Sequence, residues 1–296
     1  MRNDTHSLPK ENQFMADRLN RTDAASRHLL SIDMDDLIIA NADFFNESLS
    51  PSYRTNIDNE VMTTLDTLDE CETKATFFVS AQYSRRHDQL LREIVERGHI
   101  IASHGFRHRN IAAMPLTEFQ DDLCESLDVL SKYQSTIIGY RPPAFSMPYD
   151  HEHLGVLQKH GIRYVSSGTA VARSNAPRWN RPAEVSEGLL HVPISTVYFG
   201  SRLNYPIGYG VTSRLMPKCA YLLTLRRWLD AESYFHFYCH SFEVGGLSKV
   251  AVPFKRRLSR ITTMIYMMRC ENSRQIFREI FCACRFAPIE THLFNY

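Results

Sequence analysis

Histidine and aspartate side chains gather in two short segments that each follow an apolar run. His104 and His108 lie four residues apart after the run 100–103, and the acidic segment 33–36 (Asp-Met-Asp-Asp) follows the run 29–32. Imidazole nitrogens and carboxylate oxygens are the ligands that zinc and related divalent ions take in proteins. Two neutral imidazoles with one carboxylate leave positions open for water and a substrate. These segments therefore predict a divalent metal site.

The acidic segment offers a choice of carboxylate ligand. Asp33 and Asp35 lie on the same face of an extended strand, because side chains alternate between the two faces. We therefore favour Asp35 as the metal ligand, with Asp36 as the alternative. His104 and His108 share a face if the turn after their strand is helical.

Two further polar side chains follow predicted strands. Arg141 comes after the run 137–140, and His240 comes after the run 234–239. A single histidine at a strand end is usually a structural, hydrogen-bonded group. In parallel α/β folds, however, reactive side chains gather at the carboxyl ends of the strands. Four strand ends that carry Asp, His, Arg and His together therefore indicate an active site.

Short apolar runs alternate with helical patterns along most of the chain, which is typical of a mainly parallel α/β fold. The predicted strands are 29–33, 76–79, 100–103, 137–140, 161–165, 192–197 and 234–239. The predicted helices are 58–68, 89–96, a helix that begins after Pro115, and 151–160. We expect a long surface loop over 201–217 and basic amphipathic helices within 254–284.

The composition limits the classes of protein that remain. A chain of 296 residues with 44% hydrophobic residues can bury one large core, and its formal net charge of +1 gives no reason to expect nucleic acid as a partner. No apolar run is long enough to cross a bilayer. We expect a flexible polar segment over 1–28 and a single domain over 29–290, which includes C-terminal helices from about residue 253.

The cysteines show no pattern of a disulfide framework. Their number is odd, seven, and only Cys282 and Cys284 lie close together, without a CxxC spacing. Together with the absence of an apolar signal segment, this predicts reduced thiols and a cytoplasmic location.

The ordered motifs resemble a known family. Asp33-Met34-Asp35, His104-x-x-x-His108, Arg141-Pro142-Pro143 and His240 follow one another as they do in the polysaccharide deacetylases, the NodB-homology proteins of carbohydrate esterase family 4. Segments 192–196, 208–217 and 240–243 are similar to the subgroup associated with exopolysaccharide gene clusters. The resemblance implies an α/β fold, a distorted (β/α)7 barrel, here with a helical C-terminal extension.

The resemblance also implies roles for individual residues. Asp35, His104 and His108 would bind a divalent metal, most simply Zn²⁺, with Co²⁺ or Ni²⁺ as alternatives. Asp33 would be the general base, oriented by Arg141, and His240 the general acid. The residues expected to contact the sugar are Pro143, Phe145, Tyr209 and Arg214.

One position departs from the family pattern. The family commonly has an aspartate in its fourth motif as the partner of the catalytic histidine, whereas this chain has Val165. Glu243 or Asp150 is left as a substitute partner. We expect a hydrolase that removes N-acetyl or N-formyl groups from an amino-sugar-containing glycan or its precursor. The alternatives are an O-acetyl esterase or small-amide hydrolase, and a non-catalytic carbohydrate-binding homologue. The oligomeric state is left open.

Overall fold

The structure is a computed structural model that describes residues 28–49, 55–168, 180–199, 203–232, 234–246 and 254–294. Apart from His28, the expected polar segment 1–28 lies outside these residues. The main sheet has the strand order β10 (His236–His240), β1 (His28–Met34), β2 (Thr76–Val79), β3 (Ile100–Ser103), β4 (Gly139–Tyr140), β5 (Tyr164–Ser167), β7 (Leu189–Pro193) and β6 (Ala183–Ser186). All neighbours in this order are parallel except β6 and β7.

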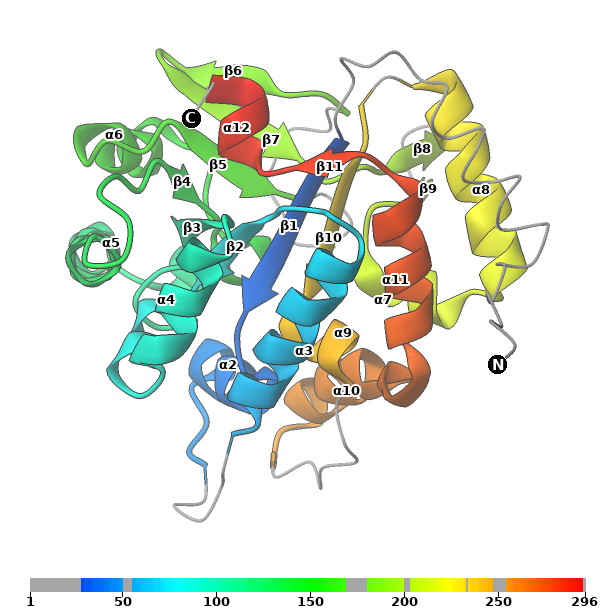
Figure 1. The fold of residues 1–296 in the computed structure, drawn as a ribbon. Coiled ribbons are helices and arrows are strands. Elements are labelled where there is room, and N and C mark those ends of the chain that lie inside the picture. Colours follow the sequence, from blue (N-terminus) through cyan, green and yellow to red (C-terminus); the bar gives the residue numbers. More distant parts are fainter. Residues whose placement is uncertain are drawn as a thin grey trace.

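The sheet curls until its two ends approach each other. Just after β7, the backbone N–H of Ser195 donates to the carbonyl of His236 on β10, at 3.2 Å. A parallel bridge joins Tyr209 to Tyr238 on the same strand. The short strand β11 (Phe286–Ala287) pairs with the beginning of β1. This is the expected distorted (β/α)7 barrel, followed by a helical C-terminal part (Figure 1).

Helices cover the outside of the curled sheet because each presents one apolar face to it. In α4 (Asp88–Glu96), the side chains of Leu90, Leu91 and Ile94 are buried, while most polar residues face outward. The other covering helices are α3 (Ile57–Glu70), α5 (Leu116–Leu130), α6 (His151–Lys159), α8 (Lys218–Ala231) and α11 (Arg274–Ala283). Aromatic side chains fill much of the main core, including Phe77, Phe237, Phe277 and Phe281.

The expected long loop over 201–217 is wrong for most of its length. Residues 203–205 form β9 (Leu203–Tyr205), which pairs with β8 (Val197–Phe199), and α7 (Gly210–Leu215) follows. Gly208 lies against β10, where a Cβ atom would come within 2.3 Å of the carbonyl oxygen of His236. These short elements are held by tertiary contacts, which local composition does not encode.

The C-terminal part is helical, as expected. It contains α9 (Ser241–Gly245), α10 (Arg257–Met267), the 3₁₀ turn η4 (Cys270–Asn272), α11 and α12 (Ile289–Phe294). Among the described residues, every helix is too short or too polar to cross a lipid bilayer.

The prediction that all cysteines are reduced is wrong for one pair. Cys71, at the end of α3, forms a disulfide with Cys282 of α11, and their Cα atoms lie 4.7 Å apart. The two residues are 211 positions apart in the sequence, so their pairing follows only from the packing of α11 against α3. Cys124, Cys219, Cys239, Cys270 and Cys284 are free thiols.

Candidate metal centre and active site

The end of β1 separates the two candidate carboxylates. Asp36 caps the N-terminus of α2 (Leu37–Phe45), where its Oδ1 accepts hydrogen bonds from the backbone N–H groups of Ile38 and Ile39, both at 2.9 Å. Asp35 instead lies with His104 and His108, and one ligand atom from each of these three buried residues falls within 4.8 Å of the others. The geometry therefore favours Asp35 over Asp36, because the carboxylate of Asp36 serves the helix.

Backbone carbonyls orient both imidazole rings. His104 Nδ1 lies 2.7 Å from the carbonyl oxygen of Arg141, and His108 Nδ1 lies 3.0 Å from that of Ala40. A carbonyl can only accept, so Nδ1 carries the proton and the Nε2 lone pair faces the site. Burial lowers the pKa of His108 to about 3 and lowers the pKa of His104 from its ordinary value. Both rings are therefore neutral near pH 7 and able to bind a metal.

The segment between the two histidines is a loop and not a helical turn. Asp122 on α5 accepts hydrogen bonds from the backbone N–H groups of Phe106, at 2.8 Å, and Arg107, at 3.2 Å. Gly105 has a φ of +78°, and a Cβ atom there would lie 2.8 Å from Asp122 Oδ2. This loop brings the two imidazole centroids to 5.0 Å without helical geometry.

The donor set fits a divalent cation. Within the described part of the chain, Asp35 Oδ1 and His104 Nε2 are buried without a hydrogen-bond partner, although buried polar atoms are usually paired. His108 Nε2 lies 3.6 Å from Asp35 Oδ2. Burial raises the pKa of Asp35 to about 7, which reflects an uncompensated carboxyl group. Two nitrogen ligands and one oxygen ligand are a usual set for catalytic zinc.

Arg141 is fully buried next to the candidate metal ligands, and its backbone carbonyl contacts His104. Its Nη1 donates to Asp33 Oδ1 at 2.6 Å, and its Nη2 donates to the hydroxyls of Ser31 and Ser166, both at 2.7 Å. Burial alone would raise the pKa of Asp33, but the charge of Arg141 and the neighbouring imidazoles lower it overall. Asp33 is therefore held as a carboxylate, and its Oδ2 lies 3.6 Å from His104 Nε2.

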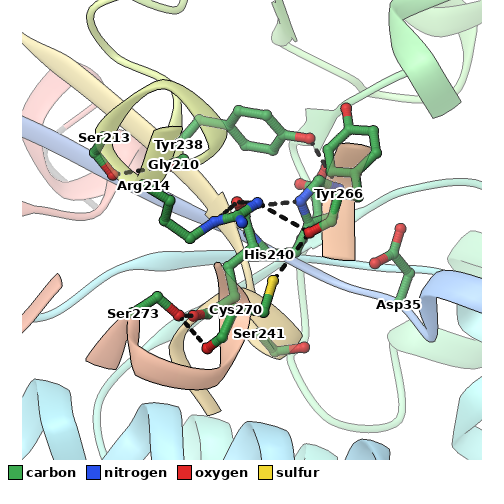
Figure 2. Close-up of polar contacts among 12 residues, drawn as sticks. Asp35, Gly210, Ser213, Arg214, Tyr238, His240, Ser241, Tyr266, Cys270 and Ser273 are labelled. Carbon is green, nitrogen blue, oxygen red and sulfur yellow. Dashed lines mark hydrogen bonds and ion pairs between the residues drawn. The ribbon is translucent and has the colours of Figure 1, made fainter. Parts of the chain in front are cut away.

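Across the cavity, His240 ends β10 and is paired with Glu243. Glu243 Oε2 accepts from the backbone N–H of His240 at 2.8 Å and lies 3.0 Å from its Nδ1. Arg214 donates to Glu243 Oε1 through Nε, at 2.8 Å, and through Nη2, at 2.6 Å. Figure 2 shows Arg214 directed towards His240, with Tyr266 and Asp35 in the same region.

The charges of Arg214, Glu243 and His240 stabilise one another. Burial would raise the pKa of Glu243, but Arg214 and His240 together lower it to about 2. Burial would lower the pKa of His240, but Asp35 and Glu243 raise it to about 9. Near pH 7 the buried group therefore contains a carboxylate between a guanidinium and an imidazolium.

The fourth-motif position is not directed into this site. Val165 packs among the apolar residues beneath α5 and α6, including Phe119 and Leu157. Its neighbour Ser166 is the residue that contacts Arg141. The other proposed substitute, Asp150, accepts a hydrogen bond from the backbone of His153 as the cap of α6. Of the two proposed substitutes, Glu243 is therefore the one that contacts His240.

A cavity of about 480 Å³ opens over these residues. Asp33, Asp35, His108, His240 and Phe145 line it. The sequence did not indicate that α2 and α10 also line it, through Phe44, Phe45, Leu258, Thr262 and Tyr266. A helix that forms one wall of a site only by folding back over it leaves no local signal in the sequence.

Three of the four residues expected to contact a sugar are absent from the described lining of this cavity. Pro143 is buried in the turn η3 (Pro143–Phe145), and Tyr209 packs edge-on against Phe145 and Tyr238. Arg214 is buried against Glu243, where it compensates the carboxylate. Of the four, Phe145 is the one that lines the described cavity, and sugar contact stays a prediction.

Comparisons with known proteins point to one family. The polysaccharide deacetylase family model matches residues 54–165. The chain is 27% identical over 85 residues to a peptidoglycan-N-acetylglucosamine deacetylase of Bacillus cereus, a match that covers 29% of this chain and 30% of that protein. It is 32% identical over 59 residues to the peptidoglycan-N-acetylmuramic acid deacetylase PdaA of Bacillus subtilis, covering 20% and 22%. The alignments thus span less than a third of either relative.

The fold comparison extends over more of the chain. A crystal structure from Mycobacterium smegmatis, provisionally named a polysaccharide deacetylase, superposes with a TM-score of 0.53 at 18% identity, covering 90% of this chain and 94% of that one. At this identity the likeness shows a shared fold. Membership of the exopolysaccharide-associated subgroup stays a prediction. The family model identifies a polysaccharide deacetylase domain over residues 54–165, and most of the chain shares the barrel fold of the Mycobacterium smegmatis protein.

Proposed function

We propose that the protein is a metal-dependent hydrolase that removes N-acetyl or N-formyl groups from an amino-sugar-containing glycan or its precursor. The observation that carries this proposal is the cluster of Asp35, His104 and His108 at a cavity that two further titratable groups, Asp33 and His240, also line. The family and the named activities of the two relatives support the same reaction class.

Asp35, His104 and His108 are the residues that would hold the ion. Zn²⁺ suits two imidazoles and one carboxylate, and Co²⁺ or Ni²⁺ are alternatives. A divalent ion in this position supplies Lewis-acid polarisation of the acyl carbonyl and lowers the pKa of a water molecule from about 15.7 towards about 7. The two backbone carbonyls that accept from Nδ1 keep both rings aimed at it.

The remaining groups handle protons. Asp33 stays ionised because Arg141 donates to it, so it can accept a proton from the attacking water. His240 is held protonated beside Glu243, so it can donate a proton to the departing amine. An amine leaves poorly without a proton, so amide cleavage requires such an acid. The opposite pKa shifts of Asp33 and His240 match these two assignments.

Val165 in place of the fourth-motif aspartate favoured the O-acetyl alternative, because it left His240 without its usual carboxylate partner. Without a carboxylate beside it, the histidine would favour a leaving group that needs less protonation. Glu243 lies 3.0 Å from His240 Nδ1, so this reason for an ester substrate is lost. We therefore rank amide hydrolysis above ester hydrolysis, and both above a non-catalytic role.

A substrate panel tests the proposal. Matched N-acetylated and O-acetylated amino-sugar glycans are incubated with metal-stripped protein reloaded with Zn²⁺, Co²⁺ or Ni²⁺, and released acetate is measured. We expect acetate from the N-acetylated glycans, and formate from N-formylated ones, only after metal is restored. Release from the O-acetylated glycans alone would instead assign the esterase activity.

A double variant connects this activity to the site. His104→Ala with His108→Ala should lose both bound metal, measured by elemental analysis, and acetate release. His153→Ala, which removes a histidine from α6, is the matched control and should keep both. Full activity in the double variant would rule out the proposed centre.

A further inference from the structure

Helix α10 buries small hydroxyl side chains and exposes several large apolar ones. Its buried side chains are the small hydroxyl residues Ser259 and Thr263. Tyr266 and Met267 pack against Leu37 and Phe242. The other large apolar residues are exposed: Leu258 by 54%, Ile261 by 42%, Met264 by 56% and Ile265 by 43%, followed by Met268 by 52%. We call these five residues the docking face. Surface helices normally turn such residues towards the core, so an exposed stripe indicates an interaction site.

The spacing makes the docking face continuous. Leu258, Ile261, Ile265 and Met268 follow one another by three or four residues, which places them in one row along a helix. Met264 lies beside this row. Figure 1 shows α10 in the lower part of the molecule, where it packs against α2.

Basic residues flank and interrupt this apolar row along the chain. The segment 255–269 contains five basic residues and no acidic one, although the whole chain has a formal net charge of only +1. The five are Lys255, Arg256, Arg257, Arg260 and Arg269. Arg260, Arg269 and Lys218 also line a second cavity of about 1020 Å³ beside α10, together with one acidic residue, Glu271. The surface thus combines an apolar row with a cationic border.

We propose that the docking face binds an anionic lipid surface, with α10 lying in the plane of the head groups. An amphipathic helix with apolar residues on its outward face and basic residues around them binds in this way, because apolar burial and attraction to anionic lipids add. Leu258, Thr262 and Tyr266 of α10 also line the cavity that holds Asp35 and His240. Docking therefore places the candidate active site beside the membrane surface.

Charge argues against a second copy of the chain as the occupant. A two-fold interface brings the same patch of both subunits together, so five cations would face five cations. In such a dimer, the repulsion between the two sets of cations would oppose burial of the apolar row. An anionic lipid surface can bury the apolar row and also attract the basic residues. This binding does not depend on the proposed hydrolase reaction.

Co-sedimentation of the full chain with vesicles tests the proposal. Vesicles of phosphatidylcholine alone are compared with vesicles that also contain phosphatidylglycerol, at low and high salt. We expect binding to the phosphatidylglycerol vesicles that weakens as salt rises. Arg257→Gln with Arg260→Gln should weaken it about 30-fold, since each cation near an anionic leaflet contributes about fivefold. Ile261→Ser with Ile265→Ser should remove binding although all charges remain.

A matched variant on another helix controls for general charge effects. Arg226→Gln with Arg227→Gln removes the same charge from α8 and should bind as the unchanged protein does. Circular dichroism and metal content verify that each variant is folded. Equal binding to both vesicle types, or equal loss in the α8 variant, would overturn the proposal. So would a dimer in sedimentation velocity that Ile261→Ser with Ile265→Ser dissociates while vesicle binding is absent.

Discussion

The Nδ1 atom of His240 lies 3.0 Å from Oε2 of Glu243. The other carboxylate oxygen of Glu243 accepts two hydrogen bonds from Arg214, so the three side chains form a buried row that ends at the cavity. His240 Nε2 lies 3.0 Å from the hydroxyl of Tyr238. Glu243 therefore fixes the orientation of the ring from behind, as a carboxylate behind a catalytic histidine does.

Replacing Glu243 by glutamine should reduce turnover more than substrate binding. The carboxylate raises the pKa of His240, second to the effect of Asp35, and an acid is active only below its pKa. Its loss lowers that pKa, so the alkaline limb of the rate profile should move to lower pH, and kcat should fall about 100-fold. The measurement is kcat and KM for deacetylation across pH.

Asp150→Asn is the control for this prediction, because Asp150 caps α6 and contacts His153. It should leave the pH profile of deacetylation unchanged. An unaltered profile in Glu243→Gln, or a shifted one in Asp150→Asn, would show that His240 relies on another group.

Replacing Arg141 by methionine should destabilise the fold strongly. The variant leaves the carboxylate of Asp33 buried without its cation, and breaking a buried pair costs about 3–5 kcal/mol in the free energy of unfolding. Adding Asp33→Asn should restore part of this loss, because the uncompensated charge is then absent. Urea unfolding of the two single variants and the double variant measures the coupling.

The comparison variant for Arg141 is Arg181→Gln, which removes a surface ion pair with Glu232. Exposed pairs contribute little to stability, so its unfolding midpoint should stay close to that of the unchanged protein. Similar midpoints for Arg141→Met and Arg181→Gln would contradict the structural role of the buried pair.

Acid should destabilise the protein through buried neutral histidines. Burial lowers the pKa of His99 and His236 to about 3, and that of His28 and His191 to about 4. The unfolded chain titrates near 6.5, so it binds more protons than the folded chain below that pH. Stability is then complete above about pH 6.5 and falls towards pH 4, by on the order of 1 kcal/mol per pH unit for each histidine.

One substitution isolates a single histidine from this effect. His99 Nδ1 accepts a hydrogen bond from the backbone N–H of Ala75, which an asparagine side chain can also accept. His99→Asn should therefore reduce the slope of unfolding free energy against pH, whereas the exposed-site variant His151→Asn should not. Parallel slopes for His99→Asn and the unchanged protein would count against a neutral, buried His99.

Removing the disulfide should lower stability without changing the fold. Cys71→Ser with Cys282→Ser releases a link between residues 211 positions apart, and such links typically contribute about 2–4 kcal/mol. Thermal unfolding with and without a reducing agent measures the loss. Cys219→Ser, at an exposed free thiol, is the control and should have no effect. Seven titratable thiols in unreduced, denatured protein would show that the link does not form.

Much of the site was predictable because it depends on strand ends. Asp33, His104, Arg141 and His240 each follow or end an apolar run, and parallel strands bring their carboxyl ends to one edge. Strands β2 and β3 match their predicted bounds, since short β-branched and aromatic runs between helical patterns are strong local signals. The choice of Asp35 likewise follows from strand alternation.

The amino-acid sequence by itself determined the order of the main parallel strands and their covering helices, and the side chains that meet above the sheet, because periodicity and strand ends are local properties. The tertiary structure decided which distant groups become partners. Arg214 with Glu243, Cys71 with Cys282, and α10 as a wall of the cavity depend on how separate elements pack. It also turned Val165 away from the site, because that side chain's direction depends on which face of β5 meets the helices. Contacts between remote segments leave no pattern in the residues around either partner.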